Sequence, residues 1–115
     1  YNKQNELLIK GIPASGGIVA GDAVFLGRNY NEVDWNTGDI LLAWFTDPDW
    51  IDIMEKSSGL ITAVGGMLCH AAIIARELGI PCVTGIGSEN MKSIWNGCKI
   101  RMNGHSGTIE IIREN

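Results

Sequence analysis

Residues 65–81, with the sequence GGMLCHAAIIARELGIP, combine a glycine pair, one histidine and a nearly all-apolar run. The glycines predict a flexible loop, and His70 stands where the apolar run begins. Gly79 and Pro81 follow the run, and a glycine followed by a proline is typical of the residues just after a helix. Because the run is apolar nearly all round, it predicts a short and mostly buried helix over residues 69–78, with His70 in its first turn.

His70 in this setting predicts a nucleophile beside an anion-binding site. The first N–H groups of a helix lack intrahelical partners, and together with the helix dipole they attract anions. Gly65 and Gly66 allow conformations in which further N–H groups converge on one point. A neutral imidazole can attack phosphorus through one nitrogen while a hydrogen bond holds the other. His70 is therefore the candidate catalytic residue, and Gly65, Gly66 and Cys69 are the candidate phosphate-binding residues. An ordinary, partly exposed surface histidine is the alternative.

The remaining sequence alternates short apolar segments with turn residues, which predicts a mixed α/β domain with about two main helices. Asp47 can cap a helix and Pro48 suits its first position, so a helix should begin there and run to about Lys56, with Gly59 ending it from the C′ side. Residues 27–38 are polar and predict a surface loop, and residues 13–17 predict a turn. The predicted strands cover residues 7–12, 18–26, 39–44, 60–64, 82–84, 99–102 and 108–112, the last two as a hairpin, and a brief helix capped by Ser88 runs to residue 94.

The composition fits a single domain over residues 1–115, and because the chain begins at Tyr1 we expect it to be part of a longer polypeptide. The hydrophobic fraction is 45% and the net charge is −4. No basic patch is present, which argues against a nucleic-acid partner, and no apolar run approaches the ~20 residues that span a bilayer. Cys69, Cys82 and Cys98 form neither a CxxC pair nor a zinc-binding spacing, so we expect reduced thiols, a cytoplasmic protein and no metal site.

The sequence around His70 resembles the phosphohistidine signature of the phosphoenolpyruvate-utilising enzymes, closest to their phosphoenolpyruvate synthase and rifampicin phosphotransferase branches. Outside the signature, residues 11–17 are similar to the opening Gly-x-Pro-x-Ser-x-Gly of that family. Residues 46–50 are similar to the segment before the phosphohistidine strand, and residues 101–111 to the closing hairpin. The signature is close to Gly-Gly-x-Thr-Ser/Cys-His-x-Ala-Ile-x-Ala-Arg-Glu-x-Gly-Ile-Pro-x-Val-x-Gly, which this chain matches at Gly65, Gly66, Cys69, His70, Ala72, Ile73, Ala75, Arg76, Glu77, Gly79, Ile80, Pro81, Val83 and Gly85.

The resemblance implies a swivelling β/β/α phosphohistidine domain of a phosphotransferase. It implies that a nucleotide-binding ATP-grasp domain of the same protein, which would hold ATP and Mg²⁺, phosphorylates His70 on Nε2. The domain then swivels, and a small molecule held by an acceptor-site domain takes the group. Pyruvate or phosphoenolpyruvate, another metabolite and an antibiotic all remain open as that molecule. We expect no cofactor, nucleic acid or membrane bound to this domain, and the domain alone would be incomplete as an enzyme.

Two positions depart from the family pattern. Leu68 replaces a common threonine beside the histidine, and Asn103 replaces a common aspartate of the last hairpin, where Asn-Gly forms the same turn. Leu68 leaves a second interpretation open, a non-catalytic docking or regulatory domain with the same fold. A third is a dehydratase-type swivel subunit that shares only the architecture. Arg76, six positions after His70, should point away from it and form a local ion pair or cap.

Overall fold

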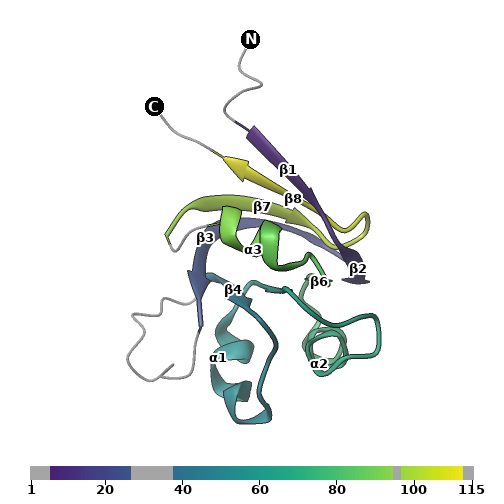
Figure 1. Cartoon of the computed structure of the whole chain (residues 1–115). Helices are drawn as coiled ribbons and strands as arrows, with labels where there is room; N and C mark the ends of the chain where they lie inside the picture. Colours follow the sequence, from purple (N-terminus) through teal and green to yellow (C-terminus); the bar gives the residue numbers. More distant parts are fainter. Residues whose placement is uncertain (1–5, 27–37, 95–96, 113–115) are drawn as a thin grey trace.

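The structure is a computed structural model that describes residues 6–26, 38–94 and 97–112. Its eight strands form one sheet in the order β1-β8-β7-β3-β4-β5-β6-β2 (Figure 1). The strands are β1 (Glu6–Lys10), β2 (Ile12–Ser15), β3 (Ile18–Phe25), β4 (Ile40–Ala43), β5 (Gly59–Thr62), β6 (Cys82–Thr84), β7 (Lys99–Asn103) and β8 (Thr108–Ile112). The helices are the 3₁₀ helix η3 (Pro48–Trp50) and the α-helices α1 (Ile51–Lys56), α2 (His70–Leu78) and α3 (Ser88–Ser93).

Strand β3 joins two differently built parts of this sheet. Residues 18–22 pair antiparallel with β7, whereas residues 23–25 pair parallel with β4. Gly21 lies two residues before the first residue that pairs with β4, and a Cβ there would lie 3.1 Å from the Gly38 carbonyl oxygen. A glycine in a strand is typical of a close approach by another backbone segment. The strand predicted over residues 18–26 is therefore confirmed as β3, which serves both parts of the sheet. The sequence also predicts a bulge or kink at Gly21 and Asp22, but the pairing of β3 with β7 and β4 shows no register shift there.

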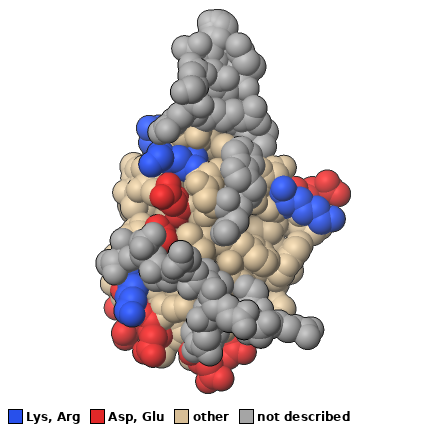
Figure 2. Space-filling view, turned by 90° about the vertical axis from the view of Figure 1, so that its left-hand side faces the viewer, with Lys and Arg blue, Asp and Glu red and all other residues tan. Residues whose placement is uncertain are grey.

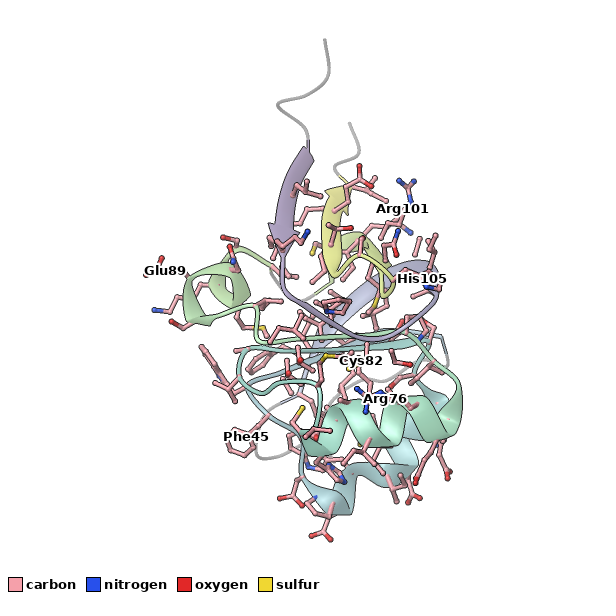
Figure 3. The ribbon with its side chains drawn as sticks, turned by 90° about the vertical axis from the view of Figure 1, so that its right-hand side faces the viewer. Phe45, Arg76, Cys82, Glu89, Arg101 and His105 are labelled. Atoms are coloured by element: carbon pink, nitrogen blue, oxygen red, sulfur yellow. The ribbon has the colours of Figure 1, made fainter. Side chains whose placement is uncertain are left out.

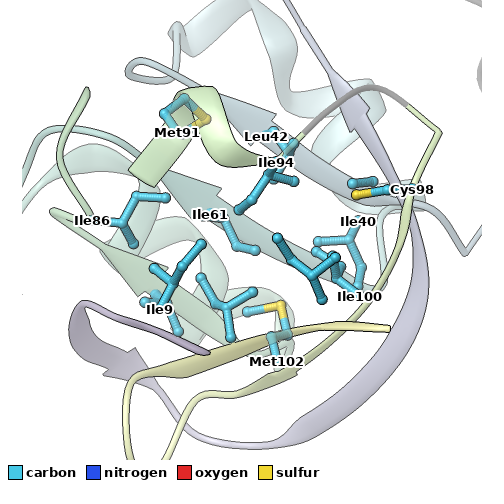
Figure 4. Close-up of a cluster of buried hydrophobic side chains, with 14 of the residues drawn as sticks. Ile9, Ile40, Leu42, Ile61, Ile86, Met91, Ile94, Cys98, Ile100 and Met102 are labelled. Carbon is cyan, nitrogen blue, oxygen red and sulfur yellow. The ribbon is translucent and has the colours of Figure 1, made fainter. Parts of the chain in front are cut away.

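The parallel strands carry side chains into two separate cores, one on each face. In β4, Ile40 and Leu42 join one cluster of buried residues, and Leu41 and Ala43 join the other. The first cluster lies among the antiparallel strands, β4 to β6 and α3 (Figure 4). The second lies between the parallel strands and the helices α1 and α2, which both lie below the sheet in Figure 1. Strands buried on both faces are typical of parallel sheets covered by helices, which explains the continuous apolar runs in the sequence.

Most predicted elements are confirmed, and the mixed α/β fold class is confirmed with them. The helix with His70 in its first turn is α2, and Gly79 caps it in the left-handed conformation with φ +75°. Asp47 caps η3 as predicted, with its Oδ1 accepting a hydrogen bond from the Asp49 N–H at 2.9 Å. The expectation that α2 is mostly buried is only partly right, because Ile73 is 43% exposed.

Three local predictions are wrong. The predicted turn over residues 13–17 is largely strand β2, which pairs antiparallel with β6 at the edge of the sheet. Pro13 is compatible with that edge position, because a strand at the edge of a sheet has a neighbour on one side only and does not use every N–H in pairing. The register of the β2–β6 pairing shifts after Pro13. Gly59 begins β5 rather than ending the helix, although α1 does end at Lys56 as predicted, with Ser57 as its C-cap. Ser88 is the first residue of α3, whose N-cap is Gly87. The predicted loop over residues 27–38 lies outside the described residues except for Gly38.

Charged side chains are scattered in small groups over the face shown in Figure 2. Two exposed ion pairs link neighbouring strands of the antiparallel part, Lys99 with Asp22 at 3.5 Å and Arg101 with Glu110 at 2.8 Å. Exposed pairs of this kind contribute little to stability, typically ~0.2–1 kcal/mol. Among the described residues, none of the helices is long and apolar enough to cross a bilayer.

Candidate functional site

His70 lies where the loop after β5 enters α2, at the carboxyl end of the parallel strands. Thr46 follows the neighbouring strand β4 and reaches the same edge of the sheet. In open α/β sheets, ligands bind outside the carboxyl ends of the strands. The fold therefore places the histidine at the edge where a site is expected, and it brings a threonine from 24 residues earlier beside it.

The His70 ring is held through one nitrogen. Its Nδ1 lies 2.9 Å from the Thr46 hydroxyl oxygen, and the residue is partly buried. When the Nδ1–H donates to Thr46 Oγ1, the Nε2 atom keeps its lone pair and can act as a nucleophile. Either atom of this contact can be the donor, and the tautomer with its proton on Nδ1 is the one that attack through Nε2 requires.

A small pocket of about 110 Å³ opens beside the histidine. This is well below the ~300–1,000 Å³ of pockets that hold drug-sized molecules, and it suits a group the size of a phosphoryl. None of its lining residues is Lys, Arg, Asp or Glu, so the polar groups that a bound anion would meet in this lining are amides, hydroxyls, a thiol and the imidazole. The lining residues are Phe45, Thr46, Thr62, Val64, Gly65, Cys69, His70 and Ala71.

The two glycines of the loop are not equivalent. Gly65 has a φ of +116°, and a Cβ there would lie 2.8 Å from the Cys69 sulfur. Gly66 has no positive φ, and a Cβ there would have no neighbour within 4 Å. Of the predicted phosphate-binding residues, Gly65 and Cys69 line the pocket and Gly66 does not. The loop conformation therefore requires glycine at position 65 and not at position 66.

Side chains hold the carbonyl groups of this loop. The Thr62 hydroxyl donates to the Val64 carbonyl at 2.7 Å, and the Thr84 hydroxyl donates to the Gly66 carbonyl at 3.2 Å. Arg76 donates to two carbonyls, from Nε to Ala14 at 2.8 Å and from Nη2 to Met67 at 2.5 Å. Arg76 does point away from His70, but the predicted ion pair or cap is wrong, because its partners are backbone carbonyls of a strand and a loop.

The cysteines near the site differ in environment. Cys69 is the N-cap residue of α2, and its side chain makes no capping hydrogen bond. Cys82 is fully buried in β6, and burial raises the pKa of its thiol to about 12, with the nearby Cys69 adding to the rise and Arg76 opposing it. Both are free thiols, as expected. Cys82 is therefore a packing residue, and phosphate binding by Cys69 stays a prediction.

Four large apolar side chains in the two segments that lead to the site are exposed: Phe45 (65% exposed), Val64 (53%), Met67 (54%) and Leu68 (83%). Phe45 and Val64 also line the pocket. We call these four residues the apolar rim. Phe45 follows β4 (Figure 3), and the other three belong to the loop after β5. Contiguous exposed apolar side chains of this kind are typical of surfaces that contact another protein or ligand.

The other histidine has a different position. His105 lies in the β7–β8 hairpin, where its ring packs on Gly16, and it does not line the His70 pocket (Figure 3). In the described part of the chain, no group of three or more His, Cys, Asp or Glu side chains is arranged to hold a metal ion.

Sequence reasoning missed three threonines of the site, Thr46, Thr62 and Thr84. Each stands at or just after the carboxyl end of one of the observed strands β4, β5 and β6, whereas the predicted strand over residues 60–64 placed Thr62 inside the strand. Because the carboxyl ends of adjacent parallel strands meet at one edge, that shared position was the signal that could have identified them.

The chain matches the family model of the PEP-utilising enzyme mobile domain over residues 35–107. Among curated relatives, the chain is 44% identical over 104 residues to a rifampicin phosphotransferase of Bacillus subtilis, covering 90% of this chain and 12% of that protein. It is 39% identical over 107 residues to a phosphoenolpyruvate synthase of Aeropyrum pernix, covering 92% of this chain and 13% of that protein. The chain thus spans about an eighth of the length of these relatives.

Solved structures share the fold. The solution structure of Enzyme I matches with a TM-score of 0.60 and 27% identity, covering 71% of this chain and 34% of that chain. Aconitase X of Thermococcus kodakaraensis matches with a TM-score of 0.73 over 93% of this chain and 99% of that chain, at 19% identity. At 19% identity, the similarity to aconitase X shows the fold alone.

Proposed function

This chain belongs to the mobile-domain family of PEP-utilising enzymes, and from that premise we propose that it is the phosphocarrier domain of a phosphotransferase, with His70 as the residue that is phosphorylated. The observation that carries the proposal is the contact between His70 Nδ1 and the Thr46 hydroxyl, which leaves Nε2 available beside a pocket of phosphoryl size. Gly65, Cys69 and the first turn of α2 would surround the transferred group.

The proposed reaction has two transfers. In the first, the lone pair of Nε2 attacks a phosphorus atom of ATP, an N–P bond forms, and the P–O bond breaks with its electrons leaving on the nucleotide. In the second, an oxygen of the acceptor attacks the same phosphorus, and the P–N bond breaks and returns the lone pair to Nε2. The proton of the acceptor leaves to a base of the acceptor-site domain. Covalent relay divides one difficult transfer into two easier ones.

The chemistry of the pocket supports the proposal that another domain supplies the cations for phosphoryl transfer. A phosphohistidine would bring negative charge into a pocket that has no Lys or Arg in its lining. Amide groups at a helix N-terminus stabilise such charge, but phosphoryl transfer also needs cations at the transferring oxygens. We infer that an ATP-grasp domain, with ATP and Mg²⁺, supplies them and that no cofactor binds to this domain alone.

The apolar rim supports docking of those partner domains around His70. A partner that reaches Nε2 would cover Phe45 and Val64, which line the pocket, and covering exposed apolar surface favours association. The relatives include phosphoenolpyruvate synthases and rifampicin phosphotransferases, so the proposed acceptor is a small molecule with a nucleophilic oxygen, of the pyruvate or antibiotic class. The free thiols of Cys69 and Cys82 support a reducing, cytoplasmic location.

The second candidate function is a non-catalytic docking or regulatory domain. The exposed Leu68, in place of a threonine, is the observation that favours it. A domain that only docks would not require the contact between Thr46 and His70, so the two candidates differ at that pair of residues.

The test is phosphoryl labelling of the intact phosphotransferase with γ- or β-labelled ATP. We expect label on His70 that is stable in base and labile in acid, and no label in the His70→Ala variant. His105→Ala is the matched control, since His105 lies in a hairpin away from the pocket. Label in His70→Ala equal to that in His105→Ala would reject the carrier role and favour the docking function.

A further inference from the structure

We propose that Arg76 is a positioning residue for phosphoryl transfer: it does not touch the phosphoryl group but holds the loop over residues 64–69 in the shape that surrounds it. This inference rests on the proposed carrier role of His70. It is drawn from the two backbone carbonyls to which Arg76 donates, which belong to segments far apart in the sequence.

The Arg76 side chain joins three elements at one point. Arg76 belongs to the last turn of α2, its Nε donates to Ala14 in β2, and its Nη2 donates to Met67 in the loop. In Figure 3 the Arg76 side chain extends from α2 toward the strand that contains Cys82. The guanidinium is close enough to lower the pKa of the Cys82 thiol, against the larger effect of burial. The edge strand, the helix and the loop are therefore fixed to one another by one side chain.

The direction of the loop N–H groups follows from the position of its carbonyls. No peptide bond in the described residues is cis, and in a trans peptide the C=O and the following N–H point in opposite directions. Because Arg76 holds the Met67 carbonyl, the Leu68 N–H points away from Arg76, toward the opposite side of the loop. The same geometry applies at the two carbonyls that threonines hold.

Three loop N–H groups are thereby left as donors. The N–H groups of Gly65, Met67 and Leu68 follow the three held carbonyls, and within the described part of the chain none of them donates to a protein acceptor. Successive N–H groups in a turn can form a concave anion-binding surface. Of these three residues, Gly65 lines the His70 pocket, and Met67 and Leu68 follow it in the same loop. The held carbonyls thus prepare the loop for an anion before the phosphoryl group arrives.

The loop needs such an external constraint. It contains two glycines, and a Cβ at position 66 would have no neighbour within 4 Å, so packing does not fix the backbone there. Glycine-rich backbone loses more conformational entropy than other backbone when it is ordered. Hydrogen-bond donors lower the barrier of a reaction most when they are already ordered around the position of the transition state. Arg76 supplies the ordering at the middle of the loop, between the Gly66 carbonyl and the start of α2.

Arginine is suited to this position because its planar guanidinium presents several donors in a fixed fork. A lysine ammonium could reach one of the two carbonyls but could not hold both with the same geometry. Removing the guanidinium would leave the Ala14 and Met67 carbonyls without this donor. The expected defect is therefore a loosened loop with His70 and its Thr46 contact still present.

The experiment uses the intact phosphotransferase with Arg76→Met, Arg76→Lys and, as a matched control, Arg101→Met, which breaks only an exposed ion pair on the antiparallel strands. We expect Arg76→Met to slow single-turnover phosphorylation of His70 by about 10- to 100-fold, as small misplacements of a reacting group do. The KM for ATP should stay unchanged, since ATP binds to the other domain. Arg76→Lys should recover part of the rate, and hydrogen exchange should rise in residues 64–69 and not in β7 or β8.

Two outcomes would overturn the inference. One is a phosphorylation rate for Arg76→Met equal to that of Arg101→Met. The other is hydrogen exchange that rises equally throughout the domain, which would mean that Arg76 supports overall stability and not the loop. His70→Ala, measured in parallel, keeps the two proposals apart. Label that persists in His70→Ala rejects the carrier role. If His70→Ala loses the label and Arg76→Met is phosphorylated at the same rate as Arg101→Met, only the role of Arg76 is rejected.

Discussion

The Thr46 hydroxyl and His70 Nδ1 lie 2.9 Å apart, although 24 residues separate them in the chain. Strands β4 and β5 pair in parallel and end at the same edge, so the residues that follow them meet there. The histidine is thus oriented by the strand order of the sheet and not by its own helix.

The Thr46→Val variant tests that orientation. Valine keeps the shape of threonine but cannot bond to Nδ1, so we expect His70 phosphorylation in the intact enzyme to slow about tenfold, equivalent to ~1.4 kcal/mol of barrier. Thr46→Ser should restore most of the rate. Thr108→Val removes an exposed hydroxyl of the β7–β8 hairpin and is the control. Equal rates for Thr46→Val and Thr108→Val would contradict the proposed role of the hydroxyl.

The two loop glycines provide a matched pair. Gly65→Ala must accept a φ of +116° and a contact of 2.8 Å with the Cys69 sulfur, whereas Gly66→Ala meets open space. We expect Gly65→Ala to lower the free energy of unfolding by about 1–3 kcal/mol, as strained backbone positions do. Gly66→Ala should stay within about 0.5 kcal/mol of the wild type. Urea unfolding of both variants measures the difference, and similar losses in both would show that the conformation at position 65 carries no special strain.

Thiol reactivity tests the burial of Cys82. Burial raises the pKa of its thiol to about 12, so almost no thiolate exists at pH 8. Iodoacetamide should therefore modify Cys69, which is partly exposed, and leave Cys82 unmodified in the folded protein. Peptide mass mapping after alkylation measures this. Alkylation of Cys82 at the rate seen for Cys69 would mean that β6 opens readily to solvent.

The same pKa shift predicts a dependence of stability on alkaline pH. The thiol of Cys82 titrates near 9.0 without burial and near 12 in the folded protein, so the folded state holds its proton more tightly. The stability that this group contributes is present below pH 9.0 and is lost as the pH rises toward about 12. Comparison with Cys82→Ala isolates the effect, because the other titrating groups are the same. Parallel stability curves for the two proteins above pH 9.0 would contradict this account.

The apolar rim is tested by a charge at its most exposed position. Leu68→Asp leaves His70 and Thr46 unchanged, and because Leu68 is 83% exposed we expect the free energy of unfolding to change by less than about 0.5 kcal/mol. Transfer to His70 from the nucleotide-binding domain should slow by about 5- to 10-fold, since a buried charge opposes docking. Leu8→Asp, at a residue 67% exposed on β1, is the control. Equal rates of transfer to His70 in Leu68→Asp and Leu8→Asp would show that the apolar rim is not part of the docking surface.

Local features of the sequence were enough to predict much of the fold. Asp47 and Pro48 marked a helix start, Gly79 marked the end of α2, and apolar runs marked the buried strands β4 to β6. These signals are local because a helix cap, a glycine in the left-handed conformation and a short apolar run each involve only a few neighbouring residues. Pro13 was misleading because its meaning depends on whether the strand is an edge strand, which the order of the sheet decides.

The sequence by itself determined the position of His70 at the start of a helix behind a glycine pair, and with it the family of the domain. Only the tertiary structure decided what surrounds the imidazole. The Thr46 hydroxyl contacts His70, and the Thr84 hydroxyl donates to the Gly66 carbonyl. Arg76 donates to Ala14 in β2. Each contact joins elements that the pairing of the strands brings together. Spacing along one chain cannot specify such contacts, because they depend on which strands pair and in which direction.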